Sequence, residues 1–335
     1  MLDSKTILIT GATGSFGKAL IKFLLKKHKL KKIVVFSRDE VKQFEMQQSK
    51  QFDSKVMRYL IGDVRDFDRL NLAMDGVDFV VHAAALKQVP TAEYNPFEVV
   101  KTNVIGAQNV IDACFNNNVK KVVALSTDKA ASPINLYGAT KLTSDKLFVA
   151  ANNYKGLRKT IFSVVRYGNV MNSRGSVLPL FLKQAEEGIL KITHKKMTRF
   201  NINLDEGVNF VIKSFKRMLG GEIFVPKIPS FKIVDLANAI DSKIKKEFTG
   251  IRSGEKLHEE MISSSDSLNS LEFKDYYIIV PKSEFANWNV KKYTRINKEK
   301  KFKKLTEGFT YNSLNNSSYL NIKDLKLLVK KNKDD

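Results

Sequence analysis

A strand-like segment, a glycine-rich turn and a helix-like segment follow one another at the start of the chain. Thr6–Thr10 reads TILIT, a β-branched run typical of a buried strand. The turn Gly11–Gly17 has the spacing GxxGxxG, and the amphipathic segment Lys18–Lys27 follows it. In this context the glycines allow a tight turn, a close approach to a pyrophosphate and packing of the helix on the strand. The pattern therefore favours a dinucleotide site over an ordinary strand-to-helix turn, with contacts from Gly11, Thr13, Gly14, Ser15, Phe16 and Gly17.

Strand-like and helix-like segments continue to alternate through the first half of the chain. The further strands are predicted at Lys32–Phe36, Met57–Ile61, Val77–Ala83, Val119–Leu125 and Thr160–Arg166. Alternation of this length predicts an α/β fold with a doubly wound parallel sheet. The strand signals become sparse from about Met171. We therefore predict a Rossmann domain over residues 1–170, to which some later segments return, and a mainly substrate-binding, smaller domain over residues 171–335.

The end of the second predicted strand indicates which dinucleotide is bound. A site that prefers NAD usually carries an acidic residue about 20 residues past the glycines, where it binds the ribose 2′-hydroxyl. Ser37 and Arg38 occupy that region here, and Lys42 follows one helical turn later. A hydroxyl and a guanidinium suit a 2′-phosphate. The plainer interpretation is a helix-start serine beside a solvated arginine, but we predict NADP rather than NAD.

Other predicted cofactor contacts lie just beyond strand ends, because α/β sheets bind ligands at the carboxyl edge. Asp63 follows the third strand and can accept a hydrogen bond from an adenine amino group. The small residues Ala83–Ala85 follow the fourth strand and leave space for a ligand. The predicted contacts from these regions and from the end of the sixth strand are Asp63, Val64, Ala83, Lys87 and Val170.

The stretch Ser126–Lys141 concentrates groups that can give or take protons. Asp128 and Lys129 directly follow an apolar strand-like run, and Tyr137 and Lys141 share one helical face at i and i+4. Alone, the Asp-Lys pair is equally typical of a surface turn with a weak ion pair. Alone, Tyr137 is typical of an amphipathic core helix. Together, and downstream of a glycine fingerprint, the four residues predict a site that moves both hydride and protons.

The net charge of +22 raises the question of a nucleic-acid partner. The lysines are spread over the whole length, and few aromatic residues interleave with the dense run Lys291–Lys304, as a base-stacking surface would require. We therefore expect no nucleic-acid partner, and we interpret the charge as a lysine-rich background in an enzyme with polyanionic ligands.

Cysteine, histidine and apolar residues limit the cellular setting. The single cysteine, Cys114, rules out an intrachain disulfide and fits a reducing cytoplasm. The four histidines are scattered without metal-ligand spacing, so we predict no metal site. No apolar run approaches the roughly 18 residues that a membrane span needs. The first strand starts by Thr6 and leaves no room for a signal peptide. We therefore expect a cytoplasmic protein without a membrane partner.

Several of these motifs resemble those of a known superfamily. Thr10–Gly17, Asp63-Val64, the alanine-rich strand end and the Tyr137-x-x-x-Lys141 pair are similar to the extended short-chain dehydrogenase/reductases. A more specific resemblance, to inverting UDP-N-acetylglucosamine 4,6-dehydratases, covers about residues 3 to 285. It rests on SRDEVKQ (37–43), GDVRD (62–66), AAALKQVP (83–90), STDKAASPINLYGATKL (126–142), VVRYGNV (164–170), GEIFVPKIPS (221–230) and IRSGEKLHEEM (251–261).

The resemblance implies a role for each proton-transfer group. Tyr137 would be the base for the sugar 4-hydroxyl, with its pKa lowered by Lys141 and by the positive nicotinamide ring, and Thr127 would hold the 4-oxygen. Asp128, with a pKa raised by burial, would protonate the leaving 6-oxygen. Lys129 would be the base at C5, which requires a neutral amine and hence a depressed pKa. The related dehydratases of deoxyhexose pathways have Asp-Glu here, so the lysine singles out this family.

The resemblance also implies substrate contacts, at Arg199 for the diphosphate and at Arg252 and Glu255 for the uridine and its ribose. Asn169 is suited to a sugar or diphosphate oxygen, so the predicted substrate contacts are Lys87, Thr127, Asn169, Arg199, Arg252 and Glu255. The chain departs from the family pattern at Asn172, where glycine is usual, and at Ser253, where proline is usual.

The family's soluble enzymes open pseudaminic acid synthesis for flagellin glycosylation and form dimers or larger assemblies. The resemblance therefore implies UDP-N-acetylglucosamine as substrate and a homo-oligomer, a dimer or a hexamer. Two rival functions remain open. A UDP-sugar 4-epimerase would share Tyr137 and Lys141 but would not need Asp128 and Lys129. A catalytically idle NADP-binding or RNA-binding protein could reuse the fold, but it would require none of the four residues.

Overall fold

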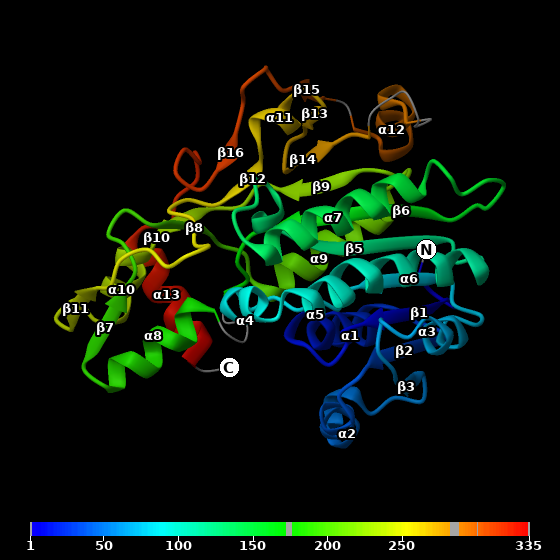
Figure 1. The fold of residues 1–335 in the computed structure, drawn as a ribbon, viewed down its shortest axis with the longest axis horizontal. Coiled ribbons are helices and arrows are strands. Elements are labelled where there is room, and N and C mark those ends of the chain that lie inside the picture. The colour runs from blue at the N-terminus through cyan, green and yellow to red at the C-terminus, as the bar shows by residue number, and fades with distance from the viewer. Residues whose placement is uncertain (1, 172–175, 282–287, 300, 334–335) are drawn as a thin grey trace.

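A ten-stranded sheet forms the centre of the protein. The computed structural model describes residues 2–171, 176–281, 288–299 and 301–333. Seven strands run parallel in the order β3-β2-β1-β4-β5-β6-β9, and β14, β13 and β15 extend the sheet antiparallel beyond β9 (Figure 1). Their bounds are β1 (Thr6–Thr10), β2 (Lys32–Ser37), β3 (Met57–Ile61), β4 (Phe79–His82), β5 (Lys121–Thr127), β6 (Ile161–Tyr167), β9 (Ile223–Pro226), β13 (Ser270–Glu272), β14 (Tyr276–Ile279) and β15 (Lys303–Lys304).

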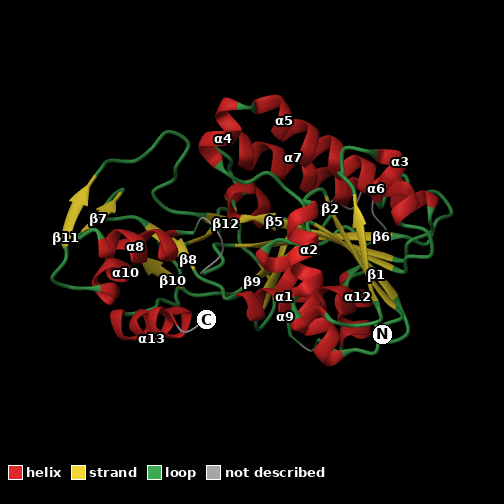
Figure 2. Ribbon diagram, turned by 90° about the horizontal axis from the view of Figure 1, so that it is seen from below, coloured by secondary structure: helices red, strands yellow, loops and turns green. Residues whose placement is uncertain are grey.

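Helices cover both faces of this sheet, which confirms the predicted doubly wound α/β fold. Figure 2 shows α3, α5, α6 and α7 on one face and α1, α9 and α12 on the other. The apolar sides of the helices and the buried central strands form the main hydrophobic core. The helices of this part are α1 (Ser15–Lys27), α2 (Glu40–Gln48), α3 (Phe67–Ala73), α4 (Val89–Tyr94), α5 (Pro96–Val100), α6 (Gly106–Asn116), α7 (Leu136–Ala151), α9 (Leu204–Arg217), α11 (Ser264–Ser267) and α12 (Val290–Asn297).

A second, smaller hydrophobic core lies at one end of the molecule, at the left in Figure 1. Leu178, Phe181, Leu190 and Phe231 are buried in it, together with Leu325 from the last helix. Its buried residues come mainly from α8 (Val177–Glu186), β7 (Ile189–Ile192), β10 (Ser230–Lys232), α10 (Ile233–Ile240) and α13 (Ile322–Lys333). The strands β8 (Thr198–Phe200) and β11 (Lys245–Phe248) pair with β10 and β7. The pair β12 (Glu260–Ile262) and β16 (Tyr311–Asn312) lies between the two parts (Figure 1).

The fifth strand ends two residues later than predicted. Its parallel pairing with β6 continues to the pair Thr127–Tyr167. The prediction ended the strand at Leu125 because the apolar run ends there, but ladder hydrogen bonds extend the strand over the polar residues Ser126 and Thr127. As a result Asp128 is the first residue beyond the sheet.

Two absences, of membrane-spanning helices and of metal-binding groups, concern the described residues only. None of the described helices is both long and apolar enough to cross a membrane. Within the same part of the chain, no group of three or more His, Cys, Asp or Glu side chains is placed to hold a metal ion.

Candidate active site

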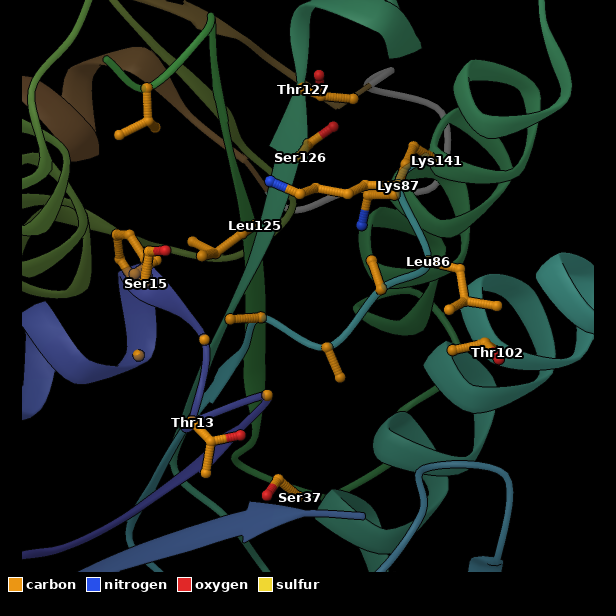
Figure 3. Close-up of a pocket in the computed structure, with 18 of the residues that line it drawn as sticks. Thr13, Ser15, Ser37, Leu86, Lys87, Thr102, Leu125, Ser126, Thr127 and Lys141 are labelled. Atoms are coloured by element: carbon orange, nitrogen blue, oxygen red, sulfur yellow. The ribbon is translucent and has the colours of Figure 1, made fainter. Parts of the chain in front are cut away.

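A cavity of about 660 Å³ opens at the carboxyl ends of β1, β4, β5 and β6. Figure 3 shows Thr13 and Ser37 near one end of it and Thr127 and Lys141 near the other. The lining contains these predicted cofactor, catalytic and substrate residues: Gly11, Thr13, Gly14, Ser15, Phe16, Gly17, Ser37, Arg38, Lys42, Asp63, Val64, Ala83, Lys87, Thr127, Asp128, Lys129, Tyr137, Lys141, Asn169 and Val170. Arg199, Arg252 and Glu255 are not part of this lining.

The glycine turn is shaped to admit a ligand phosphate. Gly11 has φ +65°, and a Cβ there would come within 2.8 Å of the backbone nitrogen of Ala84. A Cβ on Gly17 would come within 2.5 Å of the Cα of Ala12. Gly14 caps α1 without any side chain that could accept the first amides of the helix. These amides and the helix dipole therefore remain available to an anion in the cavity, and the turn fits the pyrophosphate of a dinucleotide.

Charged side chains surround the other predicted cofactor contacts. Arg38 lies 3.7 Å from Asp63, measured between Nη1 and Oδ2, and is more than half exposed. Burial works against ionisation of Asp63, but the hydrogen bonds and charge of Arg65 outweigh it and lower the pKa of this carboxyl. Lys42 forms an ion pair with Asp39. Lys42 is therefore held by a neighbouring carboxylate, while the guanidinium of Arg38 is more than half exposed to a ligand.

Local structure places Tyr137 and Lys141 beside the turn that carries Asp128 and Lys129. Asn135 caps α7, with its Oδ1 accepting a hydrogen bond of 2.8 Å from the backbone of Gly138. Gly138 matters because a Cβ there would overlap the backbone carbonyl of Lys129. The missing side chain lets the first turn of α7 pack directly on the Asp128–Ala130 turn.

Asp128 and Lys129 form a hydrogen-bonded ion pair, with 3.0 Å between Oδ1 and Nζ. Thr127 Oγ1 also lies 3.0 Å from the same Asp128 oxygen. The second oxygen, Oδ2, is buried and has no hydrogen-bond partner among the described residues. An unpartnered buried oxygen is costly, so Asp128 suits a carboxylic acid that donates to a ligand.

The structure adds Glu259, which the sequence analysis did not single out. Its Oε1 lies 3.1 Å from Lys129 Nζ and 3.7 Å from Arg199 Nε. Glu259 is almost completely buried, with 1% of its surface exposed. It belongs to the segment IRSGEKLHEEM, but nothing in the local pattern distinguished it from the neighbouring Glu260.

The directions of three pKa shifts test the expected chemistry. Burial raises the pKa of Asp128, as expected for an acid. The expectation for Lys129 was wrong: burial favours the neutral amine, but the carboxylates of Asp128 and Glu259 outweigh it and raise the pKa. In the protein alone, burial raises the pKa of Tyr137 to about 12 against the opposing charge of Lys129 and a hydrogen bond with Thr127, so Lys141 by itself does not produce the expected lowering.

Lys141 is buried above a further acidic residue, Asp145, one turn along α7. Burial lowers the pKa of Lys141, and the charge of Asp145 works in the opposite direction. Asp145 also accepts a 2.7 Å hydrogen bond from Ser126 Oγ. The base of the active site thus contains a polar network that the sequence analysis missed, because its members are far apart in the chain.

The remaining predicted substrate residues lie in different surroundings. Arg199 is buried and lies 3.8 Å from Glu255, between Nη2 and Oε1. Arg252 and Ser253 are exposed, in a loop whose Gly254 carbonyl accepts a 2.7 Å hydrogen bond from Asn135. That bond places the loop against the start of α7. Asn169 lines the cavity, and Asn172 lies outside the described residues.

Known proteins resemble this chain over nearly all of its length. The family described as "Polysaccharide biosynthesis protein" matches residues 7–281. The inverting UDP-N-acetylglucosamine 4,6-dehydratase of Campylobacter jejuni is 57% identical, over 97% of each chain. The UDP-glucose 4-epimerase of Rickettsia conorii is 43% identical, over 98% of this chain and 96% of that protein. The crystal structure of Pen from Bacillus thuringiensis superposes with a TM-score of 0.88 at 39% identity, over 99% of each chain. The chain therefore belongs to the polysaccharide biosynthesis protein family, within the extended short-chain dehydrogenase/reductase superfamily.

Proposed function

We propose that this protein is an NADP-dependent UDP-N-acetylglucosamine 4,6-dehydratase that inverts C5. The observation that carries the proposal is the Asp128–Lys129 pair, held beside Tyr137 and Lys141 in one cavity. Elimination of water needs an acid and a base in addition to the redox pair, and these two residues provide them. The Campylobacter jejuni relative, which is named for this activity, supports the same assignment.

The residues of the cavity fit a nicotinamide dinucleotide. The glycine turn and the first amides of α1 would hold the pyrophosphate, and Ser37 and Arg38 would hold a 2′-phosphate. A bound nicotinamide supplies the hydride acceptor at the start of the reaction and the donor at its end, so there is no net redox change. Lys141 and Tyr137 line the far end of the same cavity and would orient the reacting sugar there.

Tyr137 would accept the proton of the sugar 4-hydroxyl, while Thr127 holds the oxygen. With a pKa of about 12, the phenol is protonated at neutral pH in the protein alone. The charge of Lys129 and the hydrogen bond with Thr127 both favour the phenolate. The resulting 4-ketone acidifies the proton at C5 and prepares the elimination.

The Asp128–Lys129 pair can become an acid and a base without exchanging a proton with solvent. Transfer of one proton from Lys129 Nζ to the Asp128 carboxylate breaks an N–H bond, forms an O–H bond and leaves both groups neutral. The amine then takes the C5 proton, and Asp128 gives its proton to the 6-oxygen, which leaves as water while the C5=C6 double bond forms. The pair returns to ammonium and carboxylate. The hydrogen bond of 3.0 Å makes this transfer direct.

The main rival is a UDP-sugar 4-epimerase, an activity for which the Rickettsia conorii relative is named. An epimerase would use Tyr137 and Lys141 and would have no use for the ion pair that Lys129 forms with the buried Asp128 carboxylate. Burying an ion pair is costly, which favours a reaction that uses it.

Proton NMR of UDP-N-acetylglucosamine with purified protein and catalytic NADP⁺ separates the candidates. We expect a new methyl signal from C6. A change at C4 with C6 intact would establish an epimerase instead. No change with any UDP-sugar would refute both enzymes.

We further propose that the reaction takes place in the cytoplasm, in a homo-oligomer, either a dimer or a hexamer, and that its product enters pseudaminic acid synthesis for flagellin glycosylation. The family resemblance supports this setting. Light scattering on the purified protein would measure the oligomeric state, and a monomer at micromolar concentration would contradict it.

A further inference from the structure

We infer that Glu259 is a positioning residue of the elimination pair, holding the Lys129 amine between two carboxylates so that it is charged before each proton transfer and aimed at Asp128. The inference rests on the proposed dehydratase function for its purpose. The contact itself, between residues far apart in the chain, can be tested without turnover.

The backbone of Glu259 is fixed from both sides by one residue. Ser313, next to β16, accepts a 2.9 Å hydrogen bond from the Glu259 amide through its Oγ. The Ser313 amide in turn donates a 2.8 Å hydrogen bond to the Glu259 carbonyl. Thr198, next to Arg199, holds the Ser313 hydroxyl at 2.7 Å. The Glu259 side chain therefore extends from a backbone that is held rigidly, as a positioning residue requires.

The carboxylate of Glu259 points to Lys129 in the candidate active site. Its Oε1 contacts Lys129 at 3.1 Å, almost the same distance as the 3.0 Å from Lys129 to Asp128. Its Oε2 is buried and has no hydrogen-bond partner among the described residues. A buried carboxylate with one open oxygen is expensive to maintain unless its charge serves a neighbouring group.

The charged and titratable groups around Lys129 come from several elements, and they are Asp128, Tyr137, Arg199, Lys256 and Glu259. Arg199 opposes the charge of Lys129, while the two carboxylates favour it. Asp128 must carry a proton during elimination, so its charge is lost when the pair reacts. Glu259 is then the one described carboxylate in this group that keeps its charge beside Lys129 throughout the cycle.

A Glu259→Gln variant removes this charge and keeps the shape of the side chain. A carboxylate within about 4 Å shifts the pKa of a partner by roughly 1–3 units. We therefore expect the Lys129 amine to lose its proton at a pH at least about one unit lower in the variant. The rate of C5 proton exchange should rise with pH as the amine becomes neutral, because exchange needs the neutral amine. In the variant this rise should move to lower pH by the same amount.

Competitive acetylation with trace acetic anhydride, read by mass spectrometry across pH 7–11, measures the neutral fraction of the Lys129 amine directly. At pH 9 we expect the variant to label Lys129 about ten-fold faster than the wild type, since one pKa unit is a ten-fold change. Glu260→Gln is the matched control. It removes the same charge one residue away, where the side chain binds Ser132 at 2.7 Å, and it should leave Lys129 labelling unchanged.

The outcomes separate a positioning role from a purely structural one. Equal Lys129 labelling and an unmoved rise of exchange with pH in Glu259→Gln would overturn the inference. If that variant does not fold, Glu259→Asp keeps the charge on a shorter side chain, and the inference then requires slower exchange that rises at an unchanged pH. Labelling needs no turnover. A failed NMR assay would therefore refute the dehydratase while leaving the Glu259–Lys129 contact testable.

Discussion

Arg166 and Asp145 form a buried ion pair, with 3.3 Å between Nη2 and Oδ2. Each is about 1% exposed. Asp145 also binds Ser126, two residues before Asp128, and Arg166 donates a 3.0 Å hydrogen bond to the carbonyl of Met261, two residues after Glu259. The pair therefore connects β5, α7, β6 and β12, the elements that carry the proton-transfer groups.

Replacing Asp145 by alanine should lower the free energy of unfolding by about 3–5 kcal/mol, because it leaves the Arg166 charge buried without its main partner. Urea denaturation measures the change. Asp75→Ala removes an exposed carboxylate and should stay within about 0.5 kcal/mol of the wild type. A loss below 1 kcal/mol for Asp145→Ala would show that Asp266, which lies 3.3 Å from Arg166, suffices as its partner.

The Lys129→Ala variant should lose the C5 base and still bind cofactor. We expect dehydration and C5 deuterium exchange to fall by about 10²–10⁴-fold, the usual contribution of a general base. NADP⁺ affinity, measured by calorimetry, should stay within a few fold of the wild type, because the glycine turn is untouched. Retained exchange would remove Lys129 as the base.

Two glycine-to-alanine variants on neighbouring helices should have opposite effects. Gly17→Ala forces a Cβ against the Ala12 backbone, so we expect a loss of about 1–3 kcal/mol and weaker cofactor binding. Gly207 lies in α9. A Cβ added there would have a Phe16 ring carbon as its nearest neighbour, at the ordinary van der Waals distance of 3.9 Å. Gly207→Ala should therefore gain about 0.5–1 kcal/mol. Thermal and urea unfolding check both, and equal effects would contradict the packing argument.

His82 should make the protein sensitive to acid. Burial, with a smaller effect from the Lys141 charge, lowers the pKa of His82 to about 3. The unfolded chain has the ordinary value of about 6.5, so below that pH it binds a proton that the folded protein does not. Stability is therefore lost as the pH falls from 6.5 towards 3, by about 2 kcal/mol at pH 5.

A His82→Gln variant isolates this contribution, because the other titrating groups remain. Between pH 7 and pH 5, the free energy of unfolding should fall by about 2 kcal/mol less in the variant than in the wild type. The glutamine can retain a hydrogen bond to Thr10, whose hydroxyl lies 2.8 Å from His82. An identical pH dependence in both proteins would show that His82 is protonated in the folded state.

Arg38 should determine the preference for NADP over NAD. Arg38→Ala removes a charge-assisted bond to the 2′-phosphate, which we expect to weaken NADP binding about ten-fold and leave NAD binding nearly unchanged. Lys42→Ala should have a smaller effect, because the ammonium of Lys42 already forms an ion pair with Asp39. Calorimetric titration with both dinucleotides gives the ratio. Equal losses for NAD and NADP would assign Arg38 to another contact.

Short-range patterns in the sequence were sufficient for the strands β1 to β6, for the glycine turn and for four of the candidate proton-transfer residues. Gly11–Gly17 follows its strand directly, Asp128 and Lys129 are adjacent, and Tyr137 and Lys141 are one helical turn apart. Such relations follow from the period of a strand or helix, so they can be read without a tertiary structure. The doubly wound fold was predicted for the same reason.

Only the tertiary structure decided which charges meet at the Asp128–Lys129 pair. Glu259 reaches Lys129 from a distant segment, and its carboxylate joins that of Asp128 in raising the pKa of Lys129 against burial and the charge of Arg199. Burial likewise raised the pKa of Tyr137, whose helical spacing from Lys141 had suggested the opposite. The sequence by itself determined the four candidate groups that lie close together in the chain, and it left out Glu259 and Asp145. Their protonation depends on burial and on charges a few ångströms away, and long-range packing sets both.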